Sequence, residues 1–240
     1  VEFIHVLWIR IASLFICDVT PFSIGDDVLR VVFLKQYNCE VEKIIGVILF
    51  ELYLDVIVIN VPALFLSILE VLGSNQYYVP VILCSLYSSA FWTLLLLSTK
   101  KGFIRKITRR LFGRRLSRIQ FVVEELERGI SIILRKKTAF ISSIILSFLS
   151  LFLTSLALSL ASASINMPVN IIQALETYVT SQSLGIVPIP GGAGVIEYGL
   201  TLSLSPPLVV LWRIISYYIM TLITGIALIT RVAYISSKDV

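Results

Sequence analysis

The chain has 240 residues, of which 57% are hydrophobic and only 15% are charged, with a formal net charge of +5 and a mean hydropathy of +0.93. A soluble domain is about a quarter charged, so the composition excludes an ordinary soluble protein. The apolar runs are long and continuous rather than alternating, which favours helices, and the length allows about six spans of roughly 20 residues each. We therefore expect an all-α, polytopic integral membrane protein in which residues 1–240 form a single membrane domain.

The predicted first half, residues 1–99, begins with two apolar segments that are each short for a membrane span. Residues 3–17 are interrupted by His5 and Arg10, and a turn-rich stretch, residues 18–27, separates them from residues 28–34. A long apolar helix is predicted over residues 44–72, and residues 77–99 form the cleanest span, with tyrosines at its start where an interfacial belt would lie.

Residues 100–137 form a basic segment that carries 13 of the 20 Lys and Arg residues. A nucleic-acid patch would need interleaved aromatic residues on a soluble domain. For a segment tethered between two spans, the positive-inside rule and attraction to anionic lipid headgroups give a better explanation. We therefore expect an amphipathic cytoplasmic loop, a multi-pass plasma-membrane protein and no nucleic-acid partner.

The predicted second half, residues 138–240, contains a Ser- and Leu-rich span over residues 140–163 and a weaker apolar segment over residues 167–184. Residues 185–194 contain too many Gly and Pro residues for a continuous helix. A short apolar segment, residues 195–204, precedes a Pro-Pro start signal and a final span over residues 208–229.

Two Pro/Gly-broken segments suggest an internal repeat. The motif from Pro21 to Gly25 and the motif from Pro190 to Gly194 both read P-x-x-x-G, and acidic residues follow each within three positions. Paired interruptions of this kind in two halves of a chain are typical of transporters, in which broken or re-entrant helices line a site near the bilayer midplane. The alternative is two ordinary turns outside the membrane.

Ionisable residues in or beside the apolar runs are the candidate ligand contacts: Asp27, Arg30, Glu51, Asp55, Glu197 and Arg213. Charges at membrane depth usually face a cavity and a partner. Asp27 and Arg30 share one helix face, and Glu51 and Asp55 lie one turn apart. The alternative role is structural, in which ion pairs such as Arg30 with Glu51 or Arg213 with Glu197 lock helices together.

Taken in order, several short motifs resemble one known family. They are Thr20-Pro-x-x-x-Gly-x-Asp-x-x-Arg30, Glu51-x-x-x-Asp55, Pro188-x-Pro-Gly-Gly-x-Gly-x-x-Glu197, and Arg213 followed by Tyr217-Tyr218. The chain resembles the lysylphosphatidylglycerol synthase transmembrane region family of flippase-like membrane proteins. The resemblance implies a protein that moves a lipid headgroup between leaflets, with membrane lipids as ligands and a lipid-modifying synthase or glycosyltransferase as a partner.

The leading hypothesis is therefore lipid translocation. Arg30 and Arg213 would contact a phosphate, and the four acidic candidates would balance the arginines or bind an amino headgroup. The turn at Gly191, Gly192 and Gly194 would let backbone N–H groups approach the ligand.

Two other classes of function stay open, an embedded enzyme acting on a lipid-linked glycan and a non-catalytic scaffold that recruits a glycosyltransferase through the basic segment. The three cysteines have no CxxC spacing, and His5 is the single histidine. Because no nucleophile or metal motif is present, we expect a transporter rather than an enzyme, with no cofactor. The sequence leaves the lipid and the oligomeric state open.

Overall fold

The computed structural model describes residues 2–20, 24–98 and 137–236, which are almost entirely helical and contain no strand. The α-helices are α1 (Phe3–Val19), α2 (Ile24–Lys35), α3 (Val41–Asp55), α4 (Val61–Leu72), α5 (Val79–Ser98), α8 (Lys137–Ser164), α9 (Ile171–Ser183), α10 (Val195–Thr201), α11 (Pro206–Arg213) and α12 (Met220–Ser236). Two π-helical turns, η2 (Val56–Asn60) and η7 (Ile214–Ile219), and three 3₁₀ turns, η3 (Gln76–Tyr78), η5 (Leu184–Ile186) and η6 (Pro190–Gly192), complete the fold. The prediction of an all-α protein is confirmed.

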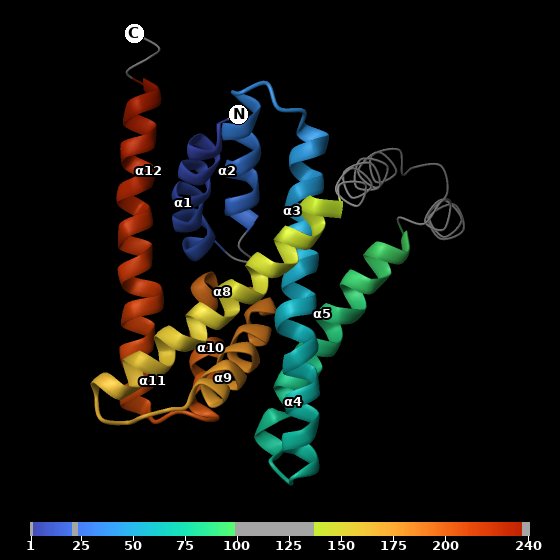
Figure 1. Ribbon diagram of the computed structural model, residues 1–240, viewed down its shortest axis with the longest axis vertical. Helices are drawn as coiled ribbons and strands as arrows, with labels where there is room; N and C mark the ends of the chain where they lie inside the picture. Colours follow the sequence, from blue (N-terminus) through green and yellow to red (C-terminus); the bar gives the residue numbers. More distant parts are fainter. Residues whose placement is uncertain (1, 21–23, 99–136, 237–240) are drawn as a thin grey trace.

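Two long composite helices frame the molecule. The π-turn η2 joins α3 to α4, and η7 joins α11 to α12, so that each unit continues through its π-turn as one rod (Figure 1). Over Lys43–Leu72 and Pro206–Ala233 these rods are long and apolar enough to cross a membrane. Each π-turn begins directly after a charged residue, Asp55 in one rod and Arg213 in the other.

Helix α8 is the third candidate span in the described part of the chain and crosses the molecule obliquely between the two rods (Figure 1). Its buried residues, Leu151, Ser155, Leu158 and Ser162, follow one another at intervals of three and four, so they form a single stripe. The small serines in this stripe let α9 pack closely. Most of the other large apolar side chains on α8 are exposed, which suits a lipid-facing surface.

Two short helical hairpins lie between the rods. Helices α1 and α2 form one hairpin in the upper half of Figure 1, and α9 and α10 form the other in the lower half. Each contains a helix too short to cross a bilayer, because α2 has 12 residues and α10 has seven. Helix α1 packs against η6, so the break in the second hairpin lies beside the first hairpin.

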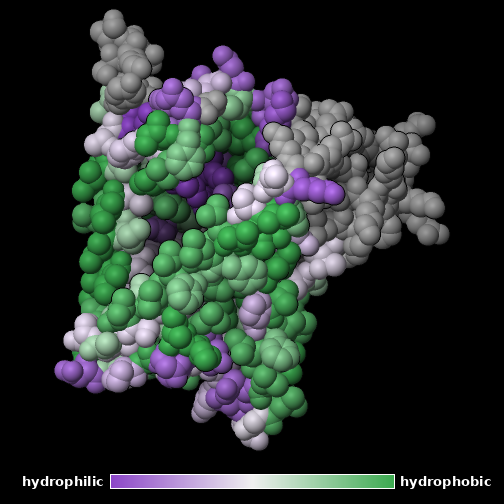
Figure 2. Space-filling model, viewed as in Figure 1, coloured by the Kyte–Doolittle hydropathy of each residue, from purple (hydrophilic) through white to green (hydrophobic). Residues whose placement is uncertain are grey.

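Hydropathy on the surface follows this arrangement. Figure 2 shows apolar side chains over the middle of the molecule and hydrophilic ones gathered at its two ends. A further hydrophilic patch lies recessed among apolar surfaces in the upper half, above the ridge formed by α8. Polar side chains at the depth of an apolar band usually face a cavity or a charged partner.

Several helix boundaries differ from the sequence predictions. Helix α9 begins at Ile171, whereas the predicted segment begins at residue 167, and α10 ends at Thr201 rather than at residue 204. The turn-rich stretch does not extend to residue 27, because α2 already begins at Ile24 and carries Asp26 and Asp27 in its first turn. Carboxylates are stabilised there by the helix dipole. The last helix continues to Ser236 rather than ending near residue 229. The basic segment, except for Lys137, and residues 21–23 of the first motif lie outside the described residues.

Candidate functional site

The second broken segment is built from left-handed glycines. Gly191, Gly192 and Gly194 have φ angles of 60°, 62° and 83°. Only glycine adopts this region without a steric penalty, so the Gly-rich sequence is what permits the chain to turn between α9 and α10. The turn brings Glu197, in the first turn of α10, back over its own backbone.

Glu197 closes this turn with both carboxylate oxygens. The Gly194 N–H donates to Oε2 at 2.7 Å, and Nε of Arg213 donates to Oε1 at 2.6 Å. The carboxylate therefore fills the position at the start of α10 where a bound anion would lie, and it ties α10 to α11. The proposed ion pair between Arg213 and Glu197 is present.

Arg213 is almost fully buried and makes two further contacts. Its Nη2 donates to the Gly191 carbonyl oxygen at 3.0 Å, and its guanidinium lies 4.5 Å from the centre of the Tyr217 ring. The same ring occupies the space beside Gly191, where a Cβ atom would come within 2.4 Å of it. Gly191, Arg213 and Tyr217 thus form one packed unit.

A first polar cluster joins α1, α2 and α3. Nη1 of Arg30 lies 2.6 Å from Glu51 Oε2 and 3.9 Å from Asp27 Oδ1, so the second proposed ion pair is also present. Arg10 of α1 forms an ion pair with Asp26 of α2. These contacts hold the first hairpin together and attach it to α3.

Part of the acidic surface in the first cluster is left open. Asp26 is buried, and its Oδ1 has no hydrogen-bond partner among the described residues. Asp55, one turn beyond Glu51 on α3, is exposed. Glu51 itself retains 42% of its side-chain exposure although it pairs with Arg30. Glu51 and Asp55 can therefore accept hydrogen bonds from a further donor.

The first break is packed as tightly as the second. A Cβ atom at Gly25 would lie 2.3 Å from Ile16 Cγ2 and 2.8 Å from Thr20 Oγ1. The Gly25 N–H donates to that same Thr20 hydroxyl at 3.2 Å, which in turn donates to the Ile16 carbonyl oxygen at 2.6 Å. The glycine is needed here for close approach of α1 and α2.

The two breaks meet at the end of α1. The Tyr217 hydroxyl donates to the Asp18 carbonyl oxygen at 3.3 Å, and the Thr221 hydroxyl donates to the Asp18 carboxylate at 2.5 Å. Asp18 stands immediately before the first break, and Tyr217 covers Gly191 in the second. Asp18 therefore joins the end of the first break to the residues that surround the second.

Sequence reasoning did not select three of the polar residues around the breaks, Arg10, Asp18 and Asp26. Each carried a signal, because Arg10 is a charge within an apolar run, and Asp18 and Asp26 flank the first break. Their roles depend on which helices meet, which the linear sequence does not specify.

Comparison with known proteins gives one result that bears on this site. Neither the curated proteins nor the solved structures contain a significant match to the chain. The family described as "Lysylphosphatidylglycerol synthase TM region" matches residues 1–224, which include every candidate residue. The polar region formed by the two broken hairpins therefore lies within the family's own domain, and this integral membrane protein belongs to the lysylphosphatidylglycerol synthase transmembrane region family.

Proposed function

We propose that this protein translocates a lipid between leaflets, holding an anionic, aminoacylated or glycan-linked headgroup in the polar region between its two broken hairpins. The observation that carries the proposal is the meeting of the two breaks through Asp18, Tyr217 and Gly191. Transporters place substrate sites where interrupted helices of two halves converge within the membrane.

The balance of charge favours one of these headgroups. The residues around the two breaks include three arginines and six carboxylates: Arg10, Arg30, Arg213, Asp18, Asp26, Asp27, Glu51, Asp55 and Glu197. Each arginine already contacts a carboxylate, so neither Arg30 nor Arg213 is free for a phosphate unless an ion pair opens. The excess of carboxylates favours an amine-bearing headgroup, because a cation would compensate charge that is costly at this depth.

The proposal also includes an internal repeat and a membrane topology. The order helix, break, short helix and long π-interrupted rod occurs twice, in α1–α4 and in α9–α12, which supports an internal repeat. The signs of the ion pairs are exchanged between the two, since Arg30 lies on the short helix of one and Arg213 on the rod of the other. In this arrangement the basic loop faces the cytoplasm of a plasma membrane, where a lipid-modifying synthase or glycosyltransferase supplies or uses the lipid.

Translocation in proteoliposomes tests the proposal. Fluorescent phosphatidylglycerol, its lysyl derivative and a glycan-linked lipid are compared for wild type, Glu197→Gln and Arg213→Ala. We expect wild-type protein to accelerate flipping, most for the lysyl lipid, and both variants to lose the acceleration while remaining folded. Wild-type rates equal to those of protein-free liposomes for all three lipids contradict the proposal.

A charge exchange separates ligand binding from helix locking. In Arg30→Glu with Glu51→Arg the ion pair between α2 and α3 can re-form with its ends reversed. We expect this double variant to regain the thermal stability lost in Arg30→Glu but not the flipping rate. Recovery of both would show that the pair only locks helices and would move the headgroup site elsewhere.

A further inference from the structure

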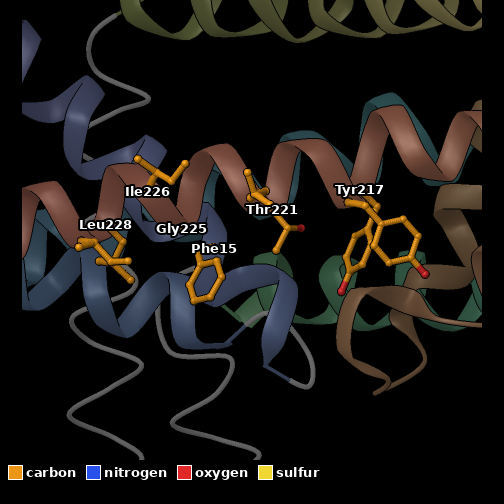
Figure 3. Close-up of a pocket in the computed structure, with 9 residues that line it drawn as sticks. Phe15, Tyr217, Thr221, Gly225, Ile226 and Leu228 are labelled. Atoms are coloured by element: carbon orange, nitrogen blue, oxygen red, sulfur yellow. The ribbon is translucent and has the colours of Figure 1, made fainter.

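A shallow apolar groove runs along the outside of the polar region. It has a volume of about 540 Å³, and Phe15 of α1 forms one wall. Residues of η7 and α12 form the rest of the lining: Tyr217, Tyr218, Thr221, Leu222, Gly225, Ile226, Leu228 and Ile229. Figure 3 shows the Phe15 ring beside Gly225, with Thr221 and then Tyr217 farther along the same helix.

One end of the groove lies beside the polar residues of the second break. Tyr217 lies at one end of the groove, against the Arg213 guanidinium, and its hydroxyl donates to the Asp18 carbonyl oxygen. Thr221 lines the groove while its hydroxyl is turned to the Asp18 carboxylate. A ligand lying in the groove would therefore have its end at the charges of the second break, and its remaining length among apolar side chains.

Size and position match one hydrocarbon chain. From Tyr217 to Ile229 the helix advances about 18 Å at 1.5 Å per residue. Half of a hydrocarbon core is about 15 Å, so the groove extends over the depth of one leaflet. Gly225 contributes to its form, because a Cβ atom there would lie 3.0 Å from the Phe15 ring. Leu222 and Ile229, on the open side, remain 65% and 71% exposed.

We propose that this groove between α1 and α12 is the binding site for one acyl chain of the lipid whose headgroup occupies the polar region. The inference rests on the proposed function for the identity of the headgroup site. A phospholipid joins a charged head to apolar chains, and the structure joins a charged site to an apolar groove in the same order. A groove that only contacts bulk lipid, or that binds another protein helix, does not require charged residues at one end.

Photocrosslinking tests the groove directly. The probe is phosphatidylglycerol, and separately its lysyl derivative, each with a diazirine on one acyl chain, in liposomes containing the full chain. We expect adducts concentrated on Phe15, Leu222 and Ile226, and fewer on Ile223, which lies on the same helix, is 50% exposed and does not line the groove. Equal labelling of Ile223 and the groove residues means that only bulk lipid is present, and overturns the proposal.

A matched pair of substitutions gives the second measurement. Leu222→Trp fills the groove, whereas Ile223→Trp places the same bulk at the neighbouring position outside it. We expect Leu222→Trp to lower labelling of the groove about tenfold. That change corresponds to losing the burial of about two methylene groups of the acyl chain. Labelling of the groove in Ile223→Trp is expected to equal that of the wild type. Equal effects of the two substitutions contradict the assignment.

Flipping rates distinguish failure of the groove from failure of the proposed function. If flipping requires Glu197 and Arg213 but is insensitive to Leu222→Trp, and labelling is unselective, the function stands and the groove does not. If labelling is selective and sensitive to Leu222→Trp while no lipid is flipped, the groove stands as a lipid site and translocation does not. If a photoreactive residue introduced at Leu222 crosslinks to a second copy or to another protein rather than to lipid, the surface belongs to a helix partner and the proposal is overturned.

Discussion

The two ion pairs that join the short helices to the long rods have the same length and different surroundings. Arg30–Glu51 and Arg213–Glu197 both measure 2.6 Å. Arg213 also binds the Gly191 carbonyl oxygen and lies against Tyr217, and Glu197 also accepts from the Gly194 N–H. Around Arg30 the nearest further acid, Asp27, is 3.9 Å away, and Glu51 is more exposed than Glu197.

This difference separates a closed unit from an open one. In the second half almost every polar atom of the ion pair is engaged by the chain itself, which stabilises the left-handed glycine turn. In the first half, Glu51 is partly exposed and Asp55 is exposed, so both can accept hydrogen bonds, and the buried Asp26 Oδ1 has no partner among the described residues. We therefore expect the second half to hold its break in a fixed geometry, and the first half to offer the more accessible acceptor groups to a ligand that also reaches the second break.

Removing the arginines gives the largest expected effect. Arg213→Ala leaves the Glu197 carboxylate and the Gly191 carbonyl without their partner, at a cost of about 3–5 kcal/mol. Arg30→Ala costs less, about 1–3 kcal/mol, because the more exposed Glu51 can be solvated. Thermal unfolding in detergent measures both. Equal losses would mean that the two halves are held alike, contrary to the comparison above.

A methyl group at the second break gives the next largest effect. Gly191→Ala adds a side chain at a φ of 60° and within 2.4 Å of the Tyr217 ring, so we expect a loss of about 1–3 kcal/mol. Gly185→Ala is the matched control, because nothing lies within 4 Å of its added methyl group, and its effect is expected to stay within about 0.5 kcal/mol. If Gly191→Ala and Gly185→Ala unfold at the same midpoint, this account of the turn is contradicted.

Loss of the hydrogen bond from Tyr217 to Asp18, which joins the two breaks, gives the smallest expected effect on stability. Tyr217→Phe keeps the ring over Arg213 but removes the hydrogen bond to Asp18, which costs about 0.5–1.5 kcal/mol. Tyr218→Phe, at an adjacent and 62% exposed position, is the control and is expected to change stability by less. Because the bond joins the first break to the second, we also expect Tyr217→Phe to lower the flipping rate, and an unchanged rate would separate the two breaks functionally.

Much of this organisation is predictable from local sequence. The continuous apolar runs predict helices, and Pro and Gly predict where they break. The sequence even indicates the Arg30–Glu51 and Arg213–Glu197 ion pairs, because a buried arginine needs a carboxylate partner and the apolar segments contain few carboxylates. The pairing of Arg10 with Asp26 and of Thr221 with Asp18 was not predictable, since it depends on helix crossings between distant segments. The π-turns were missed too, because residues 56–60 and 214–219 read as ordinary apolar helix.

Those π-turns have a consequence for how the rods tolerate length changes. A π-turn accommodates one residue more than a regular helical turn, and such turns are often retained at sites that depend on them. Deleting one residue from η2 or η7 would restore a regular helix and leave the helix beyond it close to its present orientation, because the wider turn absorbs the extra residue. Deleting one residue from a regular α-helical turn would instead rotate everything beyond it by about 100°. In the rod that contains η7, a deletion from the regular turns of α12 would therefore carry the groove lining away from α1, whereas the π-turn between Arg213 and Thr221 is the place where this rod can lose one residue.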